Sequence, residues 1–425
     1  MKKIKTIKKR YWFLGGGLLI SLVVLFVFLI PQRIPSVKAS DMMKGIKAQT
    51  VSNKSIDKPF IDNVNDFAVK LLQATNTKNE NILLSPLSAM VALSMTENGA
   101  DGTTLSQMKA AINPGLSQEE LNQYLHNYIN NLPQNKKTKL TLANSIWYRD
   151  QGNLTINKNF LQMNGDYYNA SLYKAPFNKK TVKDINNWVR ANTDNKINHI
   201  IDKINDESIM YLISTLLFDA KWLNAYEKSD VSTLEFHNND NTTAQVDGMH
   251  SNERRYLSDE KCTGFIKEYY NKDYYFVALL PNEGITIEEY LNQLTGEKFQ
   301  QLLRSPQEVG VSAVLPKFKY DYSVTMNAAL QKLGIQEAFS ERNADFSKMG
   351  KIVGGNIYLD NAVSKAFISV DEQGTKAGFV FKIEMAGKSS AYSEKKVTLD
   401  RPFLYAVVDR SSNIPIIMGA VSHLN

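Results

Sequence analysis

The stretch from Asp371 to Ser390, "DEQGTKAGFVFKIEMAGKSS", decides how the rest of the chain is interpreted. It lies between two apolar runs typical of strands, "AFISV" and "RPFLYAVVD", the second of which begins at Arg401. Gly374 and Pro402 are 28 positions apart, which is too long for a hairpin turn. A connection of that length inside a compact domain is usually functional.

This connection has the alternating pattern of a strand. Successive strand residues point to opposite faces of a sheet. One face would carry Thr375, Ala377, Phe379, Phe381, Ile383 and Met385, and the other would carry Lys376, Gly378, Val380, Lys382 and Glu384. The first set is mostly apolar and the second mostly polar. The pattern therefore predicts a loop that is able to pair in a sheet.

The composition indicates a globular body without a nucleic-acid partner. The chain has 425 residues, 43% of them hydrophobic, enough for one large core or two ordinary ones. Its net charge of +7 arises in residues 1–39, which hold eight lysines and arginines and no acidic residue. The remaining residues carry 42 basic and 43 acidic side chains, a net charge of −1.

The N-terminus predicts export. A basic cap, "MKKIKTIKKR", precedes twenty uncharged residues from Tyr11 to Ile30, which is a membrane-crossing length. The basic flank should stay in the cytoplasm, so the chain after Ile30 is expected outside the cell. "VKAS" offers a signal-cleavage site after Ala39. A cleaved signal, which we favour, and a membrane anchor in residues 11–30 on the outer face both remain open.

Familiar catalytic chemistry is not indicated. The single cysteine, Cys262, allows no intrachain disulfide and is predicted to be a small buried apolar residue. The five histidines are scattered, and no HExxH, GxSxG or CxxC pattern occurs. We therefore expect no enzyme of a familiar class, no metal site and no cofactor, although triads built from distant residues stay open.

Hydrophobic periodicity divides the chain into a connector and one mixed domain. Residues 40–57 are polar, and residues 58–425 show no internal repeat. Helices are predicted at "FIDNVNDFAVKLLQAT", at "SPLSAMVALSMTENGA" after the capping Ser85, and at "DINNWVRANTDNKINHII". Strands are predicted within 210–222, 274–281, 310–322, 365–370, 403–409 and 414–421.

Several motifs, in this order, resemble the serpin family from about Phe60 to Val421. They are "NILLSPLS", "GADGTT", "LANSIWY", "INNWVRANTDNKI", "FDAKW", "LPKFK", "LGIQEAF" with "ADFSKM", "DEQGTKA" and "RPFLYAVV". The resemblance, to a bacterial-type exported serpin, implies an α+β fold with three β-sheets, about nine helices and an exposed reactive loop, here about residues 372–400. It also implies suicide inhibition of a serine or cysteine protease.

The family mechanism explains a loop with a strand pattern. After a protease cleaves the loop, the N-terminal arm enters the main sheet as a new central strand and carries the acylated protease with it; serpin loop insertion is a standard example of strand addition. The resemblance thus implies a metastable monomer that forms a covalent 1:1 complex with a serine protease.

The resemblance also assigns site residues. The hinge would comprise Glu372, Gly374, Thr375 and Ala377, and the breach, where insertion begins, Trp222 and Lys317, the latter pairing with Glu372. The shutter, where the sheet opens, would comprise Ser85, Ser88, Ser214 and Ser364. Ser214 and Ser364 replace the family's usual Asn and His, so a water or a different hydrogen bond is expected to close the sheet there.

The count from the hinge predicts the reactive bond. Taking Glu372 as the seventeenth residue before the bond places it at Lys388-Ser389, which suits a trypsin-like protease. The loop is longer than in many serpins, and with this bond the extra residues would lie between Ser389 and Arg401. If they instead precede the bond, the bond would be at about Ala391-Tyr392 and the target would be an elastase-like or subtilisin-like protease.

Two further alternatives stay open. Lys376 and the bulky Phe379, Val380 and Phe381 depart from the small residues usual in the hinge, which favours a non-inhibitory serpin acting as a binding protein or a protease substrate. A membrane-tethered structural protein would follow if residues 11–30 are retained and the loop has no role.

The connector is open to two interpretations as well. Its apolar residues Met42, Met43, Ile46 and Val51 could dock on the body and slow sheet opening. A disordered spacer is the interpretation that we favour.

Overall fold

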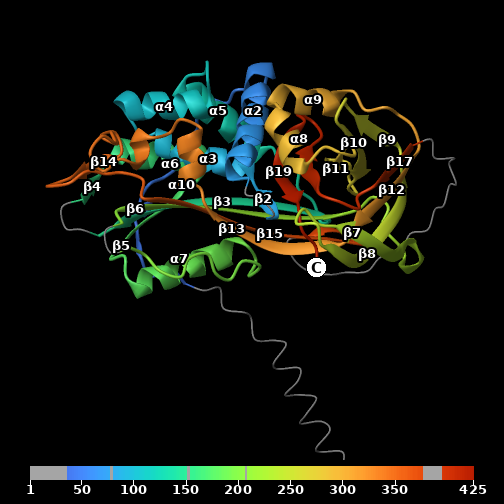
Figure 1. The fold of residues 1–425 in the computed structure, drawn as a ribbon. Coiled ribbons are helices and arrows are strands. Elements are labelled where there is room, and N and C mark those ends of the chain that lie inside the picture. Colours follow the sequence, from blue (N-terminus) through green and yellow to red (C-terminus); the bar gives the residue numbers. More distant parts are fainter. Residues whose placement is uncertain (1–35, 77–79, 151–153, 206–207, 377–394) are drawn as a thin grey trace, which may run out of the picture. The chain divides into compact units, whose positions relative to one another are not determined.

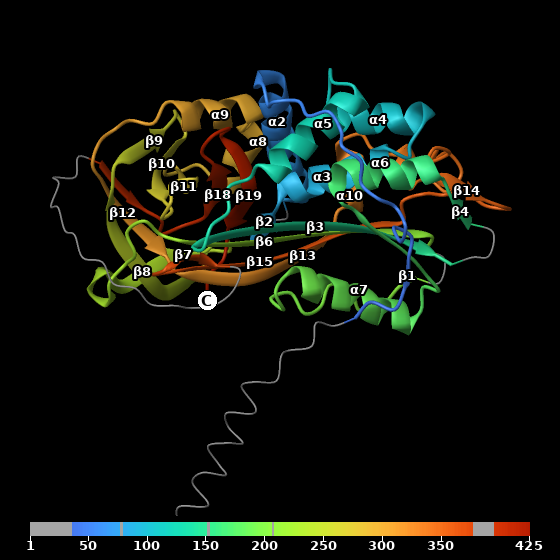
Figure 2. The ribbon, with the colours of Figure 1, turned by 180° about the vertical axis from the view of Figure 1, so that it is seen from behind.

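The computed structural model describes residues 36–76, 80–150, 154–205, 208–376 and 395–425. Val37–Asn425 form one unit of contacts, and Figures 1 and 2 show its elements from two opposite sides. Within the described ranges no helix is long and apolar enough to cross a membrane. The apolar segment 11–30 lies outside those ranges.

Helices make up much of the first half of the domain. In the described part of the chain the α-helices are α2 (Lys58–Thr75), α3 (Pro86–Glu97), α4 (Gly102–Ile112), α5 (Gln118–Asn130), α6 (Lys158–Tyr168), α7 (Lys179–Asn192), α8 (Ile287–Gln293), α9 (Gly296–Arg304) and α10 (Asn327–Lys332). Short 3-10 helices occur at Lys228–Asp230 and Glu337–Phe339.

Three large sheets and one small sheet complete the fold. The seven-stranded sheet has the order β1 (Ser40–Asp41), β5 (Ser171–Ala175), β3 (Thr138–Arg149), β6 (Met210–Lys221), β16 (Gly374–Lys376), β15 (Asn361–Asp371) and β13 (Phe318–Thr325). The six-stranded sheet has the order β2 (Ile82–Leu84), β19 (Ile414–Val421), β18 (Phe403–Asp409), β11 (Tyr274–Pro281), β10 (Cys262–Glu268) and β9 (Arg255–Ser258). The four-stranded sheet has the order β17 (Lys395–Thr398), β12 (Val311–Pro316), β8 (Thr243–Glu253) and β7 (Val231–His237), and β14 (Gly350–Ile352) pairs with β4 (Leu154–Ile156). The predicted α+β class with three main sheets is confirmed.

Local sequence signals explain where two of the helices begin and end. Ser85 caps α3 by accepting a hydrogen bond from the Ser88 N–H at 3.2 Å, and Pro86 follows at the first helical position. Helix α7 ends at Asn192, so the prediction of a helix as far as Ile201 was wrong. Asp194 and Asn195 adopt left-handed backbone angles there, φ 48° and 61°, which these two residue types tolerate and a helix cannot continue through.

Two apolar clusters lie on opposite faces of the seven-stranded sheet. Helix α7 covers one face, where Trp188 packs with Trp147 and Ile213 of the sheet. Most other helices lie over the opposite face (Figure 1), and every residue of α3 is buried there. Cys262 is also buried, as predicted, and burial raises the pKa of its thiol to about 12. The thiol is therefore chemically unreactive.

The connector lies against the domain, so the favoured interpretation as a disordered spacer was wrong for its described residues. Ser40–Asp41 pair with β5 as an added edge strand. Met43 and Ile46 pack on the main core, and both approach Gly165 of α6, where a side-chain carbon would lie 3.2 Å and 3.0 Å from them and force a small shift. The Gln162 amide of the same helix donates to the Lys47 carbonyl at 2.8 Å. The sequence of the connector alone does not reveal that its apolar residues pack beside a glycine of α6.

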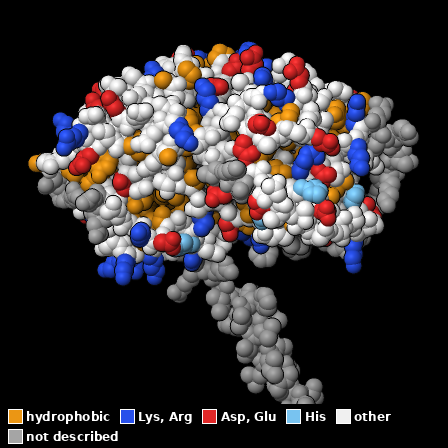
Figure 3. Space-filling view, in the orientation of Figure 1, with side chains coloured by type: hydrophobic (Ala, Val, Ile, Leu, Met, Phe, Trp, Pro, Cys, Tyr) orange, Lys and Arg blue, Asp and Glu red, His pale blue; other side chains and the backbone are white. Residues whose placement is uncertain are grey.

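The surface carries charges of both signs. In Figure 3 the Lys and Arg side chains are interspersed with Asp and Glu across the visible face, without a large region of one sign. This distribution agrees with the small net charge of the chain after residue 39.

A buried carboxyl should make the stability of the domain depend on pH. Glu97, at the end of α3, is 0% exposed, and burial raises its pKa from 4.5 to about 7 against the opposing effects of Lys109 and Asn113. Between pH 4.5 and 7 the folded protein holds a proton that the unfolded chain releases. Stability should therefore fall as pH rises through this window, by roughly 3 kcal/mol.

We expect Glu97→Gln to remove this fall and to stabilise the domain at pH 8. Urea unfolding midpoints at pH 5 and pH 8 measure the effect, with the exposed Glu283→Gln as the matched control. An equal fall in the parent and in Glu97→Gln would show that this carboxyl does not cause the pH dependence.

Candidate functional site

The seven-stranded sheet is closed at one end and opened by a short strand at the other. Strands β6 and β15 pair directly and in parallel over residues 211–214 and 361–364. At the opposite end β16 lies between them and runs antiparallel to both. The chain thus turns back after β15 and places three residues from the start of the predicted loop, Gly374–Lys376, inside the sheet.

Gly374 is required by close backbone approach. A side-chain carbon at this position would lie 2.1 Å from the Ala220 carbonyl oxygen and 2.9 Å from the Lys221 Cα. Both contacts are to backbone of β6, which cannot move aside easily. A glycine is therefore the residue that allows the chain to enter between β6 and β15.

Thr375 occupies the entrance of a narrow cavity between the two strands. Its side chain is 1% exposed, and its Oγ1 accepts a hydrogen bond from the Tyr269 hydroxyl at 2.5 Å. Beyond it the cavity is lined by Leu216, Phe218, Ala366, Phe367 and Ile368, among others. The cavity is small, with a volume of about 10 Å³, so a longer inserted strand would have to separate the residues that line it.

Trp222 holds the turn that precedes the hinge. Its indole Nε1–H donates to the Asp371 carbonyl, and its backbone N–H donates to the Gln373 carbonyl, both at 2.9 Å. The Tyr226 N–H donates to the intervening Glu372 carbonyl, also at 2.9 Å. Three successive carbonyls of the turn are thus bonded to the segment Trp222–Tyr226.

The expected ion pair at the base of the loop is present. Lys317 Nζ lies 2.5 Å from Glu372 Oε1 and 2.9 Å from Asp247 Oδ2. The pKa of Lys317 is raised because these two carboxylates outweigh the opposing effect of burial. The three side chains are 28%, 31% and 59% exposed, so each pair contributes little stability.

Two buried residues of this site were not found from the sequence. Tyr269 stacks on Trp222, with ring centroids 4.7 Å apart, and its hydroxyl reaches Thr375. Lys267 is 2% exposed, pairs with Glu253 at 2.9 Å, and lies 4.2 Å from the centre of the Tyr226 ring. Lys267 stands in the mostly apolar strand "CTGFIKE", which marks it as unusual but does not identify Glu253 of β8 as its partner.

The predicted shutter serines lie together, where β6 meets β15. The Ser88 and Ser214 hydroxyls share a hydrogen bond, and the Ser88 hydroxyl also lies 3.3 Å from the Thr215 carbonyl. Ser364 is the register partner of Ser214 across the two strands, and Ser85 caps the helix that carries Ser88. A hydrogen bond between helix α3 and the sheet is therefore present at this point.

Part of the predicted site falls outside the described residues. Ala377, the proposed bond Lys388-Ser389 and the alternative Ala391-Tyr392 all lie within 377–394.

The sequence model of the family described as "Serpin (serine protease inhibitor)" matches residues 62–424. The chain is a serpin. Among curated relatives of this serpin, intracellular coagulation inhibitor 2 of Tachypleus tridentatus is 26% identical over 372 residues, 85% of this chain and 90% of that protein. Thyroxine-binding globulin of Homo sapiens is 28% identical over 372 residues, 84% of this chain and 87% of that protein.

Solved structures of the thermophilic serpin tengpin are also similar to this serpin. The native form has a TM-score of 0.88 and 45% identity over 91% of this chain and 100% of that chain. The latent form has a TM-score of 0.78 and 42% identity over 88% and 100%. The described chain is thus more similar to the native form of that serpin than to the latent form.

Proposed function

We propose that this serpin is a suicide inhibitor of a trypsin-like serine protease, which it traps in a covalent 1:1 complex. The observation that carries the proposal is the partly entered hinge. Gly374–Lys376 already lie between β6 and β15, and Thr375 borders a small cavity lined by apolar side chains of both strands. Cleavage of the loop would free its arm to extend this strand, and the acylated protease would be carried along the sheet.

The proposed reactive bond is Lys388-Ser389. The count from Glu372 supports it, and a lysine suits a protease with an acidic primary pocket. Ser389 is a small residue on the leaving side. A bond at about Ala391-Tyr392, with an elastase-like or subtilisin-like target, is the second candidate.

A non-inhibitory role is the alternative function. Thyroxine-binding globulin is among the relatives, and its name describes a binding protein. The bulky Phe379 and Phe381 of the present loop favour slow insertion, which lets a protease complete the cleavage and leave.

Only the inhibitory function gives a covalent complex with the protease. We expect the purified chain, mixed with trypsin-like, elastase-like and subtilisin-like proteases, to give with the first a complex that survives boiling in detergent. Sequencing of the released C-terminal fragment should start at Ser389. A cleaved chain without any stable complex would identify a substrate or binding serpin, and a start at Tyr392 would move the bond.

We also propose that the protein acts outside the cell. The basic cap and the apolar residues 11–30 support export, with cleavage after Ala39 or retention as an anchor. N-terminal sequencing of the natural protein separates the two, because cleavage would give a chain that begins at Ser40.

The connector should slow the conversion of the uncleaved protein to an inactive form. It adds the edge strand β1 to the sheet that must open, and it fixes that edge to α6. We expect deletion of residues 40–55 to raise the rate of spontaneous inactivation on warming by about ten-fold or more, since several apolar contacts are lost.

A single substitution tests the same contact. Ile46→Asp should reproduce most of the deletion effect, because Ile46 packs on the core beside Gly165, whereas the exposed Lys44→Ala should not. Unchanged inactivation rates in both the deletion variant and Ile46→Asp would mean that the contact between connector and domain does not slow inactivation.

A further inference from the structure

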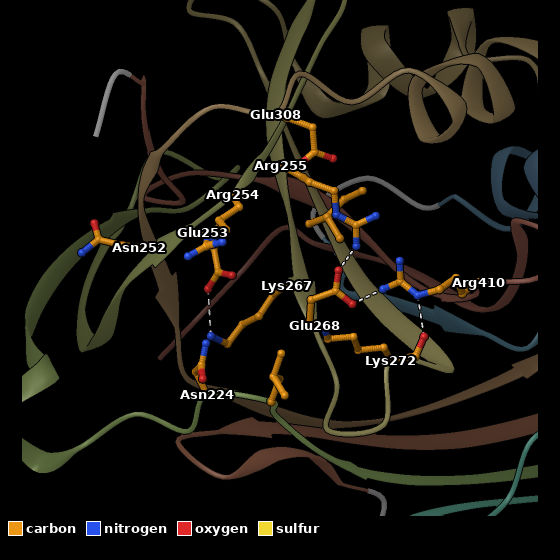
Figure 4. A pocket seen from close by; sticks show the side chains of 12 residues that line it. Asn224, Asn252, Glu253, Arg254, Arg255, Lys267, Glu268, Lys272, Glu308 and Arg410 are labelled. Carbon is orange, nitrogen blue, oxygen red and sulfur yellow. Dashed lines mark hydrogen bonds and ion pairs between the residues drawn. The ribbon is translucent and has the colours of Figure 1, made fainter. Parts of the chain in front are cut away.

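A polar cavity of about 520 Å³ lies beside the breach, bounded by β8, β9, β10 and the turn after β18 (Figure 4). Five basic side chains line it: Arg254, Arg255, Lys267, Lys272 and Arg410. Three acidic side chains line it as well: Glu253, Glu268 and Glu308. The lining therefore carries a net charge of +2, although the chain after residue 39 is close to neutral.

The two most enclosed guanidinium groups share one carboxylate. Arg255 and Arg410 each form an ion pair with a different oxygen of Glu268 (Figure 4). Lys267 is already paired with Glu253. Glu268 thus pairs with both guanidinium groups, while Glu308 and Glu253 also attract Arg255. Burial, followed by the proximity of Arg410, still lowers the pKa of Arg255. An added anion would relieve this repulsion.

The positions of these two arginines are fixed before any ligand arrives. The guanidinium carbons of Arg255 and Arg410 lie 5.4 Å and 5.3 Å from the centre of the same Tyr275 ring. The Arg255 and Arg410 side chains are 17% and 35% exposed, so they are partly shielded from water. Cations held in place and partly desolvated bind anions more strongly than mobile surface lysines do.

We propose that this cavity binds a small phosphate-bearing anion with at least two negative charges. The cations come from separate segments: Arg255 from β9, Lys272 from the turn before β11, and Arg410 from the turn after β18. They therefore reach the cavity from three segments of the chain. A tetrahedral phosphate group accepts hydrogen bonds from several directions, whereas a carboxylate accepts them mainly in one plane.

The cavity shares a wall with the segment that anchors the hinge. Leu223 and Asn224 line it, and the Leu223 N–H donates to the Glu268 carbonyl at 2.9 Å. The neighbouring Trp222 bonds the turn before β16. A ligand that binds only the folded protein raises its stability, so occupancy should raise the unfolding temperature.

Calorimetric titration of the full chain with inorganic pyrophosphate tests the site. We expect one pyrophosphate per chain, with Arg255→Gln and Arg410→Gln each weakening binding at least ten-fold. The exposed Arg342→Gln is the matched control and should leave the affinity unchanged. Pyrophosphate should also raise the unfolding temperature of the parent more than that of either cavity variant.

A variant that binds pyrophosphate more tightly than the parent separates the binding test from folding defects, because a misfolded variant would not gain affinity. Glu308 is exposed, so Glu308→Gln should fold normally, remove one competing charge and tighten pyrophosphate binding two- to five-fold. No binding by the parent, equal affinity in the parent and in folded arginine variants, or citrate binding as tightly as pyrophosphate would each overturn the proposal.

Discussion

If this serpin is the inhibitor that we propose, Thr375→Arg should turn it into a substrate. The parent threonine is 1% exposed between β6 and β15, and its hydroxyl is bonded to Tyr269. An arginine could occupy this buried position only by burying its charge, at a cost of several kcal/mol, so the hinge should be held out of the sheet and the strand should fail to extend. The protease would then finish hydrolysis before it is carried along the sheet.

The expected change is large and simple to measure. The number of serpin molecules consumed per protease molecule inactivated should rise from near one to above ten, and the boil-resistant complex should disappear. The reactive bond is untouched, so cleavage should continue. Lys376→Arg, one residue further on, adds no charge and should inhibit as the parent does. If Thr375→Arg inhibited as well as the parent, loop insertion would not be how this protein works.

Lys388→Ala should remove inhibition of the trypsin-like target. If Lys388 enters a pocket with an acidic residue, its loss leaves that acid buried without a partner, which typically costs about 2–5 kcal/mol. The second-order rate of inhibition should therefore fall on the order of 100-fold. Progress curves of protease activity at several serpin concentrations give this rate.

Two comparisons locate the effect at the bond. Lys388→Arg should retain inhibition, because the charge is kept, and Lys382→Ala, a lysine of the same loop, should leave the rate unchanged. If Lys388→Ala inhibits normally and the released fragment starts at Tyr392, the bond lies at Ala391-Tyr392 and the target class changes with it.

The sequence predicted those features that depend on local pattern or on matched motifs. The cap at Ser85, the burial of Cys262 and the strands at 274–281 and 403–409 follow from short-range rules, and the structure contains all of them. The approach of Lys317 to Glu372 came from the family pattern, since 55 positions separate these residues in the chain.

Features that depend on shape complementarity were missed. Met43 and Ile46 bind the domain because α6 presents Gly165 to them, and neither segment shows this alone. Lys267 is buried between Glu253 and the Tyr226 ring, which a residue-by-residue pattern cannot anticipate because the three come from separate elements. The end of α7 was misjudged because an apolar pattern continued past Asn192 while the backbone did not.

The direct pairing of β6 with β15 couples the rate of spontaneous inactivation to the rate of protease capture. Under the proposed mechanism, the ladder between residues 211–214 and 361–364 must break both when a protease is captured and when an unused molecule ages. Substitutions that strengthen it should lengthen storage at high temperature and slow capture in similar proportion. An engineer who wants a durable and fast inhibitor should therefore leave these eight residues alone and vary the loop after Lys376 instead.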